Sequence, residues 1–251
     1  MSNKNKLQKF AEMATFGHVV QASYGEVAGS DHPLKGRWAD QFFGNRLPLV
    51  VELGCGKGEY SVGLAERFPD KNFLGVDIKG ARMWKGATDA LEKGLTNVGF
   101  LRTRIEQIGS FFAPGEVSEI WITFPDPQAK RNRAKKRLTS AGFLNRYRVF
   151  LKPDGVVHLK TDSRLLYDFT RRVIAINGLT CLEDTDNLYG SGRADEILSI
   201  RTHYETLFME KGFTIKYLQF GLIGAVSALL EDPDPDETDY SPPVPETGGV
   251  L

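Results

Sequence analysis

Acidic side chains and a glycine-rich loop stand near the ends of short apolar runs in this sequence. The loop, V-E-L-G-C-G-K-G at residues 51–58, closes the apolar run 49–53. Asp77 closes a second apolar run, 19 residues after Gly58. Glycines let a backbone turn sharply and approach a ligand, and an acid at that spacing can accept hydrogen bonds from ribose hydroxyls. The pattern predicts a binding site for a cofactor that contains a nucleoside.

The spacing inside the loop distinguishes between classes of cofactor. A dinucleotide fingerprint would place its third glycine at position 59, which is Glu59. A carboxylate near the start of the next helix would also repel a pyrophosphate. S-adenosylmethionine (SAM) has no phosphate and carries a sulfonium, so the loop favours SAM. The alternative for the glycines is an ordinary turn, and for Asp77 an acid that merely ends a strand.

Glu52 interrupts an apolar run one residue before that run ends. A buried carboxylate without a partner is costly. A cationic amine of the ligand would be one natural partner, and an internal salt bridge is the alternative.

The segment P-D-P at 125–127 follows another apolar run, 118–124. Two prolines fix the backbone on both sides of Asp126, which would hold this carboxylate rigidly where a methyl group and its acceptor meet. The alternative is a solvated aspartate in a turn bounded by prolines.

Six cations then occur within residues 130–137. Such a run is usually a solvated face, but beside a cofactor crevice it favours phosphate contacts with a nucleic acid.

Apolar runs alternate with stretches of helical spacing along most of the chain. This alternation predicts right-handed βαβ units, hence an α/β fold with a doubly wound, mostly parallel, seven-stranded sheet. The expected strands are 49–53, 72–77, 98–102, 118–124, 155–161, 180–183 and 214–220, and the expected helices are 60–68, 81–93, 139–150 and 163–176.

Three parts of the chain are expected. Residues 1–46 would form a basic extension without assigned structure, 47–220 the catalytic domain, and 221–251 a C-terminal segment. That segment ends in an acidic, proline-rich tail, which we expect to be disordered. The last 21 residues hold seven acids and no Lys or Arg, so the remainder has 32 basic against 25 acidic residues and a net charge of +7. A basic body can attract polyanions.

The composition, 41% apolar and 25% charged, is that of an ordinary globular protein. No apolar run reaches the roughly 20 residues that span a membrane, and the N-terminus lacks the apolar region of a secretory signal. Two cysteines favour a reducing compartment. We expect a cytoplasmic protein, monomeric or homodimeric, with no membrane association, no evident protein partner and no metal.

Five segments together resemble one family. They are VELGCGKGEY, FLGVDI, FPDPQAKRNRAKKRL, HLKTDSR and THYETLF. In this order, over residues 48–220, they resemble the successive motifs of the bacterial tRNA (guanine-N7-)-methyltransferases. The resemblance implies a class I, SAM-dependent enzyme that methylates a guanine of the tRNA variable loop, usually at position 46.

The resemblance also implies roles for individual residues. Those expected to contact the cofactor are Glu52, Gly54, Gly56, Asp77, Arg104 and Asp126. Asp126 would also be the catalytic residue. Those expected to hold the guanosine of tRNA are Lys130, Asp162, Thr202, His203, Tyr204 and Glu205. Structural alternatives exist for two of these sites, because Asp162 could be only a helix N-cap and 202–205 matches a capping box.

Two positions depart from the family pattern. Arg104 stands where relatives commonly have the aspartate that meets the adenine, so this contact could come from backbone at 104 and 105 or from Glu106. Gln128 stands where many relatives have tryptophan directly after P-D-P. Two other functions stay open: a methyltransferase acting on an exocyclic amino group of another nucleic acid or protein substrate, and, because of these two departures, a tRNA-binding module without catalysis. An acceptor that is not a nucleotide is also compatible with the fold alone.

Overall fold

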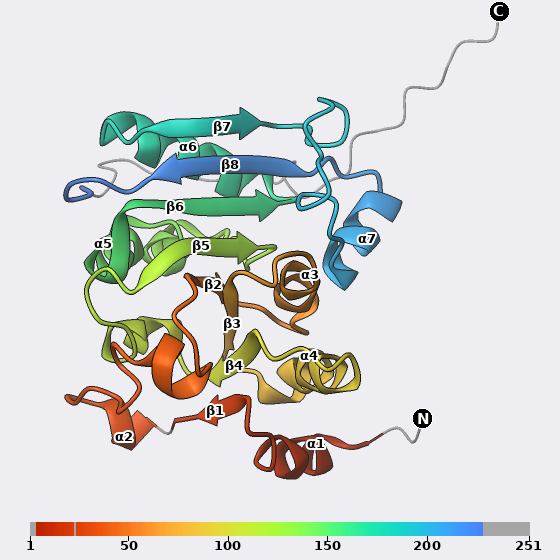
Figure 1. The fold of residues 1–251 in the computed structure, drawn as a ribbon. Helices are drawn as coiled ribbons and strands as arrows, with labels where there is room; N and C mark the ends of the chain where they lie inside the picture. The colour runs from red at the N-terminus through yellow and green to blue at the C-terminus, as the bar shows by residue number, and fades with distance from the viewer. Residues whose placement is uncertain (1–3, 23, 228–251) are drawn as a thin grey trace, which may run out of the picture.

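A single sheet runs through the protein, with the strand order β1-β4-β3-β2-β5-β6-β8-β7 (Figure 1). The computed structural model describes residues 4–22 and 24–227. The strands are β1 (Val19–Gln21), β2 (Leu49–Leu53), β3 (Asn72–Asp77), β4 (Val98–Arg102), β5 (Val117–Thr123), β6 (Leu151–Thr161), β7 (Cys181–Thr185) and β8 (Lys216–Gly221).

The sheet is mostly parallel, as predicted. Among the described strands, only β8 is reversed: it lies between β6 and β7 and is antiparallel to both. Seven of the strands match the expected ones closely. The predicted number of seven is nevertheless wrong for the described residues, which form eight strands. The additional strand is β1, in the region to which no structure was assigned from the sequence, and it forms the edge of the sheet by pairing in parallel with β4.

The helices flank the sheet on two sides. The α-helices are α1 (Lys6–Met13), α2 (Tyr24–Val27), α3 (Glu59–Arg67), α4 (Gly80–Glu92), α5 (Ala141–Phe150), α6 (Arg164–Ile176) and α7 (His203–Glu210). A π-helix, η1 (Trp38–Phe42), and two 3₁₀ helices, η2 (Ile105–Ser110) and η3 (Arg131–Lys136), complete the structure. None of these helices is long and apolar enough to cross a bilayer.

Two apolar clusters show which helices cover which face. One cluster joins α5, α6 and η2 to the sheet through side chains such as Leu144, Leu166 and Ile108. The other joins α1, α3 and α4 to the opposite face through Met13, Leu64 and others. On this second face, β6, β8 and β7 face the viewer of Figure 1 without a described helix in front of them.

The N-terminal region contributes to the same sheet and to the same helical layer. Besides β1, it provides α1, which packs against α4. The proposed division at residue 46 stays a prediction, and so does the expectation for the acidic tail, because residues 228–251 lie outside those that the structure describes.

Candidate functional site

The chain order reverses at the centre of the sheet, where β2 lies between β3 and β5. From β2 the chain first builds outward through β3 and β4, and later on the other side through β5 and β6. Ligands of open α/β sheets bind at such a switch point, beyond the carboxyl ends of the strands. A cleft of about 340 Å³ lies there. Among its lining residues are the predicted Gly54, Gly56, Asp77, Asp126, Thr202 and Tyr204.

The glycine loop after β2 adopts a backbone that few other residues would accept. Gly58 has φ +73°, and a Cβ on it would lie 2.6 Å from Cε1 of Phe100. Asp77 fastens the loop to the end of β3: its Oδ2 accepts a hydrogen bond from the Gly56 amide at 3.0 Å, and its Oδ1 accepts one from the Lys79 amide at 2.8 Å. The carboxylate that was predicted to meet a ribose thus also shapes the floor of the cleft.

Glu52 lies directly beneath this loop and is 3% exposed. Its Oε2 accepts hydrogen bonds from the amide of Ser61, at 2.9 Å, and from the hydroxyl of Ser61. Its Oε1 accepts one from the hydroxyl of Thr123, which lines the cleft. Burial raises the pKa of this carboxyl from 4.5 to about 7, although the hydrogen bonds from Ser61 and Thr123 act in the opposite direction. The structure therefore gives Glu52 hydrogen-bonding neighbours rather than the internal salt bridge considered from sequence.

The loop after β5 is held in an unusual conformation around Asp126. Phe124 has φ +48° and Gln128 has φ +49°, and they are the only residues other than glycine with positive φ in the described part of the chain. A residue other than glycine with positive φ costs about 1–3 kcal/mol of strain, and this conformation persists only where the surrounding structure enforces it. The exposed Asp126 accepts a hydrogen bond at its Oδ1 from the Gln128 amide at 2.9 Å. One carboxylate is thereby presented to the cleft in a defined orientation.

The far wall of the cleft is the start of α7. Thr202 caps this helix, and its hydroxyl accepts a hydrogen bond from the Glu205 amide at 3.1 Å. Glu59, at the start of α3, accepts a hydrogen bond from the His203 amide at 2.9 Å. The capping box expected from sequence is present, and it places Thr202 and Tyr204 in the lining of the cleft.

Glu205 is buried and lies among partners of its own. Lys160 of β6, also buried, approaches its carboxylate to 2.8 Å and donates further hydrogen bonds to the carbonyls of Leu198 and Ile200. Tyr189 donates to the same carboxylate at 2.6 Å. These contacts fasten the segment before α7 to the sheet. Burial lowers the pKa of Lys160, while Glu205 acts to raise it. Glu205 therefore has a structural role. Its predicted contact with the guanosine of tRNA stays a prediction.

Besides the buried Glu52 and Glu205, four predicted residues lie outside the lining of the cleft, and one of them is His203, which is exposed in the first turn of α7. The other three are Arg104, Lys130 and Asp162. Arg104 is exposed at the N-cap of η2, although its neighbour Ile105 lines the cleft. Lys130 is exposed at the N-cap of η3. Asp162 is partly buried; burial raises its pKa, and its carbonyl accepts a hydrogen bond from Lys216 at 3.0 Å. Contacts of these side chains with ligands stay predictions.

Arg137 requires a correction. The sequence grouped it with Lys135 and Lys136 as a phosphate contact, but it is 0% exposed, whereas both lysines are exposed. It donates instead to two backbone carbonyls of the loop that holds Asp126. A side chain with no accessible surface is not available to a polyanion, so the basic surface comprises Lys130, Arg131, Arg133, Lys135 and Lys136.

Several lining residues were not singled out from sequence. They are Lys57, Ile78, Lys79, Arg82 and Leu138, while Ile105 was named only for its backbone. All lie close in sequence to motifs that were predicted to form the site. This proximity is the signal that could have identified them as lining residues. The apolar members, Ile78, Ile105 and Leu138, provide surface suited to a flat ring. No group of three or more His, Cys, Asp or Glu side chains that could hold a metal ion occurs in residues 4–22 and 24–227.

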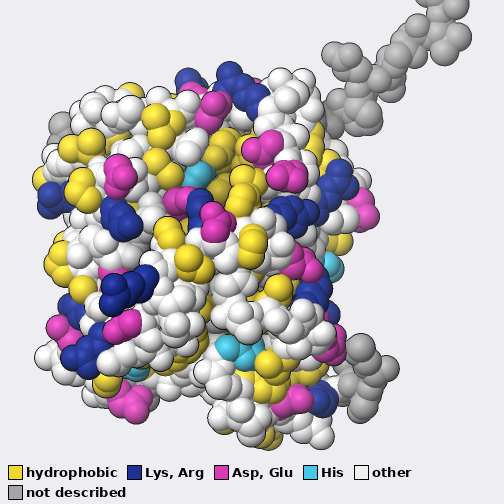
Figure 2. All heavy atoms as spheres, viewed as in Figure 1, with side chains coloured by type: hydrophobic (Ala, Val, Ile, Leu, Met, Phe, Trp, Pro, Cys, Tyr) yellow, Lys and Arg dark blue, Asp and Glu magenta, His cyan; other side chains and the backbone are white. Residues whose placement is uncertain are grey.

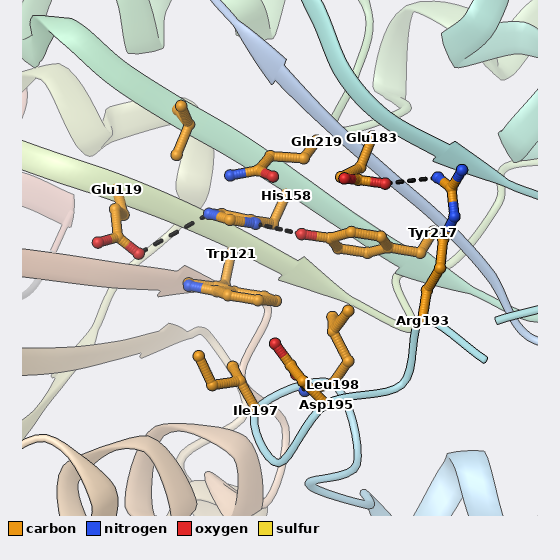
Figure 3. A pocket seen from close by; sticks show the side chains of 11 residues that line it. Glu119, Trp121, His158, Glu183, Arg193, Asp195, Ile197, Leu198, Tyr217 and Gln219 are labelled. Carbon is orange, nitrogen blue, oxygen red and sulfur yellow. Dashed lines mark hydrogen bonds and ion pairs between the residues drawn. The ribbon is translucent and has the colours of Figure 1, made fainter. Parts of the chain in front are cut away.

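A second cavity, of about 650 Å³, lies on the sheet face that the described helices leave uncovered (Figure 3). Trp121 and His158 stack in its wall with ring centroids 3.8 Å apart. Tyr217 shares a hydrogen bond of 2.8 Å with Nδ1 of His158, and burial lowers the pKa of this histidine to about 3. The space-filling view shows hydrophobic, acidic and basic side chains mixed over this face (Figure 2). The cavity contains none of the predicted site residues, so the smaller cleft at the switch point is the candidate site.

Comparisons with known proteins show which family the chain resembles. Residues 46–218 match the family described as "Putative methyltransferase". A protein of Bacteroides thetaiotaomicron is 54% identical over 231 residues, which are 92% of this chain and 90% of the relative. One of Porphyromonas gingivalis is 53% identical over 225 residues, 88% of this chain and 91% of the relative. Both relatives are named tRNA (guanine-N(7)-)-methyltransferase.

Solved structures share the fold at low sequence identity. The 16S rRNA methyltransferase KamB superimposes with a TM-score of 0.54 and 15% identity, over 70% of this chain and 87% of KamB. A structure described as an antibiotic related methyltransferase gives a TM-score of 0.54 and 14% identity, over 84% of this chain and 98% of that chain. Both show the same α/β fold.

Proposed function

The chain belongs to the tRNA (guanine-N(7)-)-methyltransferase family, and we propose that it transfers a methyl group from SAM to N7 of a guanine in tRNA, at position 46 of the variable loop. Cytoplasmic location, tRNA as the partner and a monomeric or homodimeric state are parts of the same proposal. The observation that carries it is the single cleft into which the topology brings Asp77, Asp126 and Tyr204 from three separate parts of the chain.

The cleft suits the adenosine and the amino acid portions of SAM. Asp77 offers carboxylate oxygens at the end of β3, where a ribose would lie, and Ile78 and Ile105 offer apolar surface for the adenine. Glu52 provides negative charge beneath the glycine loop once it is deprotonated. When bound, SAM supplies an activated methyl group on its sulfonium. The residues of the chain have to bind it, orient it and admit the acceptor on one side only.

For this reaction the protein has to supply mainly the orientation of the reactants and a charge that stabilises the product. N7 of guanine carries a free lone pair at neutral pH, so no base has to remove a proton from it. In-line transfer then depends on placing N7 and the methyl carbon in a near-attack geometry. Methylation leaves the purine with a positive charge. The carboxylate of Asp126, exposed at the cleft and fixed by the Gln128 amide, would stabilise that charge as it develops.

The basic surface supports a polyanionic acceptor. Its five cations are exposed on or next to η3, and Lys136 also lines the cleft. Phosphate contacts there would position the tRNA without reading its sequence. They would bring the variable loop to the mouth of the cleft beside Asp126.

The test uses an unmodified tRNA transcript, the full-length protein and SAM labelled on its methyl group. We expect label in the RNA, and cleavage chemistry specific for N7-methylguanine should map it to one nucleotide. A matched transcript with 7-deazaguanine at that nucleotide should take up no label, because it lacks the N7 lone pair. Label that persists on the 7-deaza transcript would indicate an exocyclic amino group instead. SAM binding without any transfer would indicate a tRNA-binding module.

A further inference from the structure

We propose that Arg137 is a positioning residue for Asp126, which acts by fixing the backbone of residues 124–128 from inside the protein. The inference rests on the proposed function, because it concerns the carboxylate placed at the site of methyl transfer. It also separates one residue of the cationic run 130–137 from the tRNA-binding role of its neighbours.

Two hydrogen bonds of the Arg137 side chain converge on one short stretch of chain. Its Nε donates a hydrogen bond to the carbonyl of Pro127 at 3.2 Å, and its Nη2 donates one to the carbonyl of Gln128 at 3.4 Å. These two carbonyls directly follow Asp126. The guanidinium therefore bridges consecutive peptide groups, which a planar side chain with several donors can do and a single ammonium cannot do with the same geometry.

The loop that Arg137 holds is the one with strained backbone. Phe124 and Gln128, at its two ends, have positive φ. At the first end, the Phe124 amide donates to the carbonyl of Lys160 at 2.8 Å, which ties the loop to β6. At the second end, the carbonyl of Gln128 accepts a hydrogen bond from Arg137, and the amide of Gln128 donates one to the Asp126 carboxylate. The same residue thus connects the buried guanidinium to the exposed carboxylate.

Arg137 is itself held rigidly. It follows η3 directly, its amide donates to the carbonyl of Ala134 at 3.0 Å, and its carbonyl accepts a hydrogen bond from Ser140 at 2.9 Å. The guanidinium carbon lies 4.5 Å from the ring centroid of Phe169 on α6, a cation–π contact. With 0% of its surface exposed, the side chain is buried where it contacts both α6 and the loop.

The neighbours of Arg137 face the opposite way. Lys136 and Leu138 both line the cleft. Residues 136–138 therefore contribute two side chains to the cleft wall and one to the support behind it. An alternation of this kind explains how a run of like charges can carry two functions.

The test compares Arg137→Lys with the matched control Arg148→Lys, in which an exposed arginine of α5 undergoes the same exchange. Amide hydrogen exchange of the peptide covering 124–128 should be at least tenfold faster in Arg137→Lys and unchanged in the control. The single-turnover rate at saturating SAM and tRNA should fall by at least tenfold in Arg137→Lys. Affinity for tRNA and its salt dependence should stay as in the wild type, because the charge is retained and buried.

The two kinds of readout distinguish this inference from the proposed function. If the wild type methylates tRNA at N7 and Arg137→Lys exchanges and reacts like the wild type, the positioning role is wrong and the proposed function stands. If the wild type transfers no methyl group, the hydrogen exchange result still decides whether Arg137 fixes the loop. A reduced tRNA affinity with a smaller salt slope and unchanged loop exchange would make Arg137 a phosphate contact and overturn the inference.

A second variant covers the case in which Arg137→Lys does not fold. Phe169→Leu removes the ring against the guanidinium and keeps an apolar side chain in α6. We expect faster exchange in 124–128 and a smaller loss of single-turnover rate than in Arg137→Lys, with tRNA affinity unchanged. Unchanged exchange in this variant together with an unchanged rate would contradict the proposed support of the loop.

Discussion

Replacement of Glu52 by glutamine should make the protein more stable at neutral pH and abolish a pH dependence between about 4.5 and 7. The carboxyl has a pKa of about 7 in the folded protein and an ordinary value of 4.5, so the folded state binds its proton more tightly than the unfolded chain does. Stability from this group is therefore fully present below pH 4.5 and is lost as the pH rises through 7. The difference of 2.5 pH units corresponds to about 3 kcal/mol.

Glutamine is a suitable replacement because it resembles the protonated carboxyl. Its oxygen can accept from Ser61, and its amide group can donate to the hydroxyl of Thr123. At pH 5, just above the ordinary pKa of 4.5, the variant should therefore be more stable than the wild type by only about 1 kcal/mol. At pH 8 the variant should be more stable by about 3 kcal/mol, which for a chain of this size shifts the thermal midpoint by roughly 6–12 °C.

The assay is urea unfolding of both proteins from pH 5 to pH 8, without ligand. The difference between the two proteins isolates Glu52 from other titrating groups. Parallel pH profiles would refute the reasoning, because they would mean that Glu52 is ionised in the fold as readily as in the unfolded chain. Added SAM should reverse the order at pH 8: its ammonium group would favour the ionised wild-type carboxylate, so the wild type should be stabilised more than Glu52→Gln.

Three further predictions concern the cleft and its support. Asp126→Asn keeps the acceptor for the Gln128 amide but removes the charge, so single-turnover rates should fall by roughly 10²-fold or more with SAM affinity by calorimetry little changed; an unaltered rate would remove Asp126 from the chemistry. Replacing Lys135 and Lys136 by glutamine should lower tRNA affinity and reduce the salt slope by roughly one unit per lost phosphate contact, and an unaltered slope would place this surface outside the interface. Lys160→Met should lower the free energy of unfolding in urea by about 3–5 kcal/mol, because it leaves the Glu205 carboxylate buried without its cation. The double variant Lys160→Met, Glu205→Leu should lose less stability than this single variant. An equal or greater loss in the double variant would contradict that account.

The strands and the cleft were accessible from sequence because their signals are local. Apolar runs such as 49–53 and 72–77 were recognisable by length and by the glycine or acid that ends them, and β2 and β3 begin and end at those residues. Parallel topology then brings the carboxyl ends of such strands together without further information. For this reason Asp77 and Asp126, 49 residues apart in the sequence, could be expected in one crevice.

The features that the sequence did not reveal depend on contacts between distant segments. β1 is three residues long and has no periodicity to detect, and it exists because Val19 to Gln21 pair with β4. The basic run looks uniform in sequence, yet the turn after η3 directs Arg137 inward toward α6. Glu205 matched a capping box, but only the fold shows that Lys160, from strand β6, is its ionic partner.

The pairing of β1 with β4 has a consequence for how the chain is assembled during synthesis. Residues 19–21 leave the ribosome first, but their partners 100–102 follow about eighty residues later. This edge strand can therefore be paired only after β4 has been translated, and until then the backbone groups of β1 lack their partner. A nascent chain halted before residue 100 should leave this N-terminal segment accessible to protease, and one extended well past residue 102 should protect it.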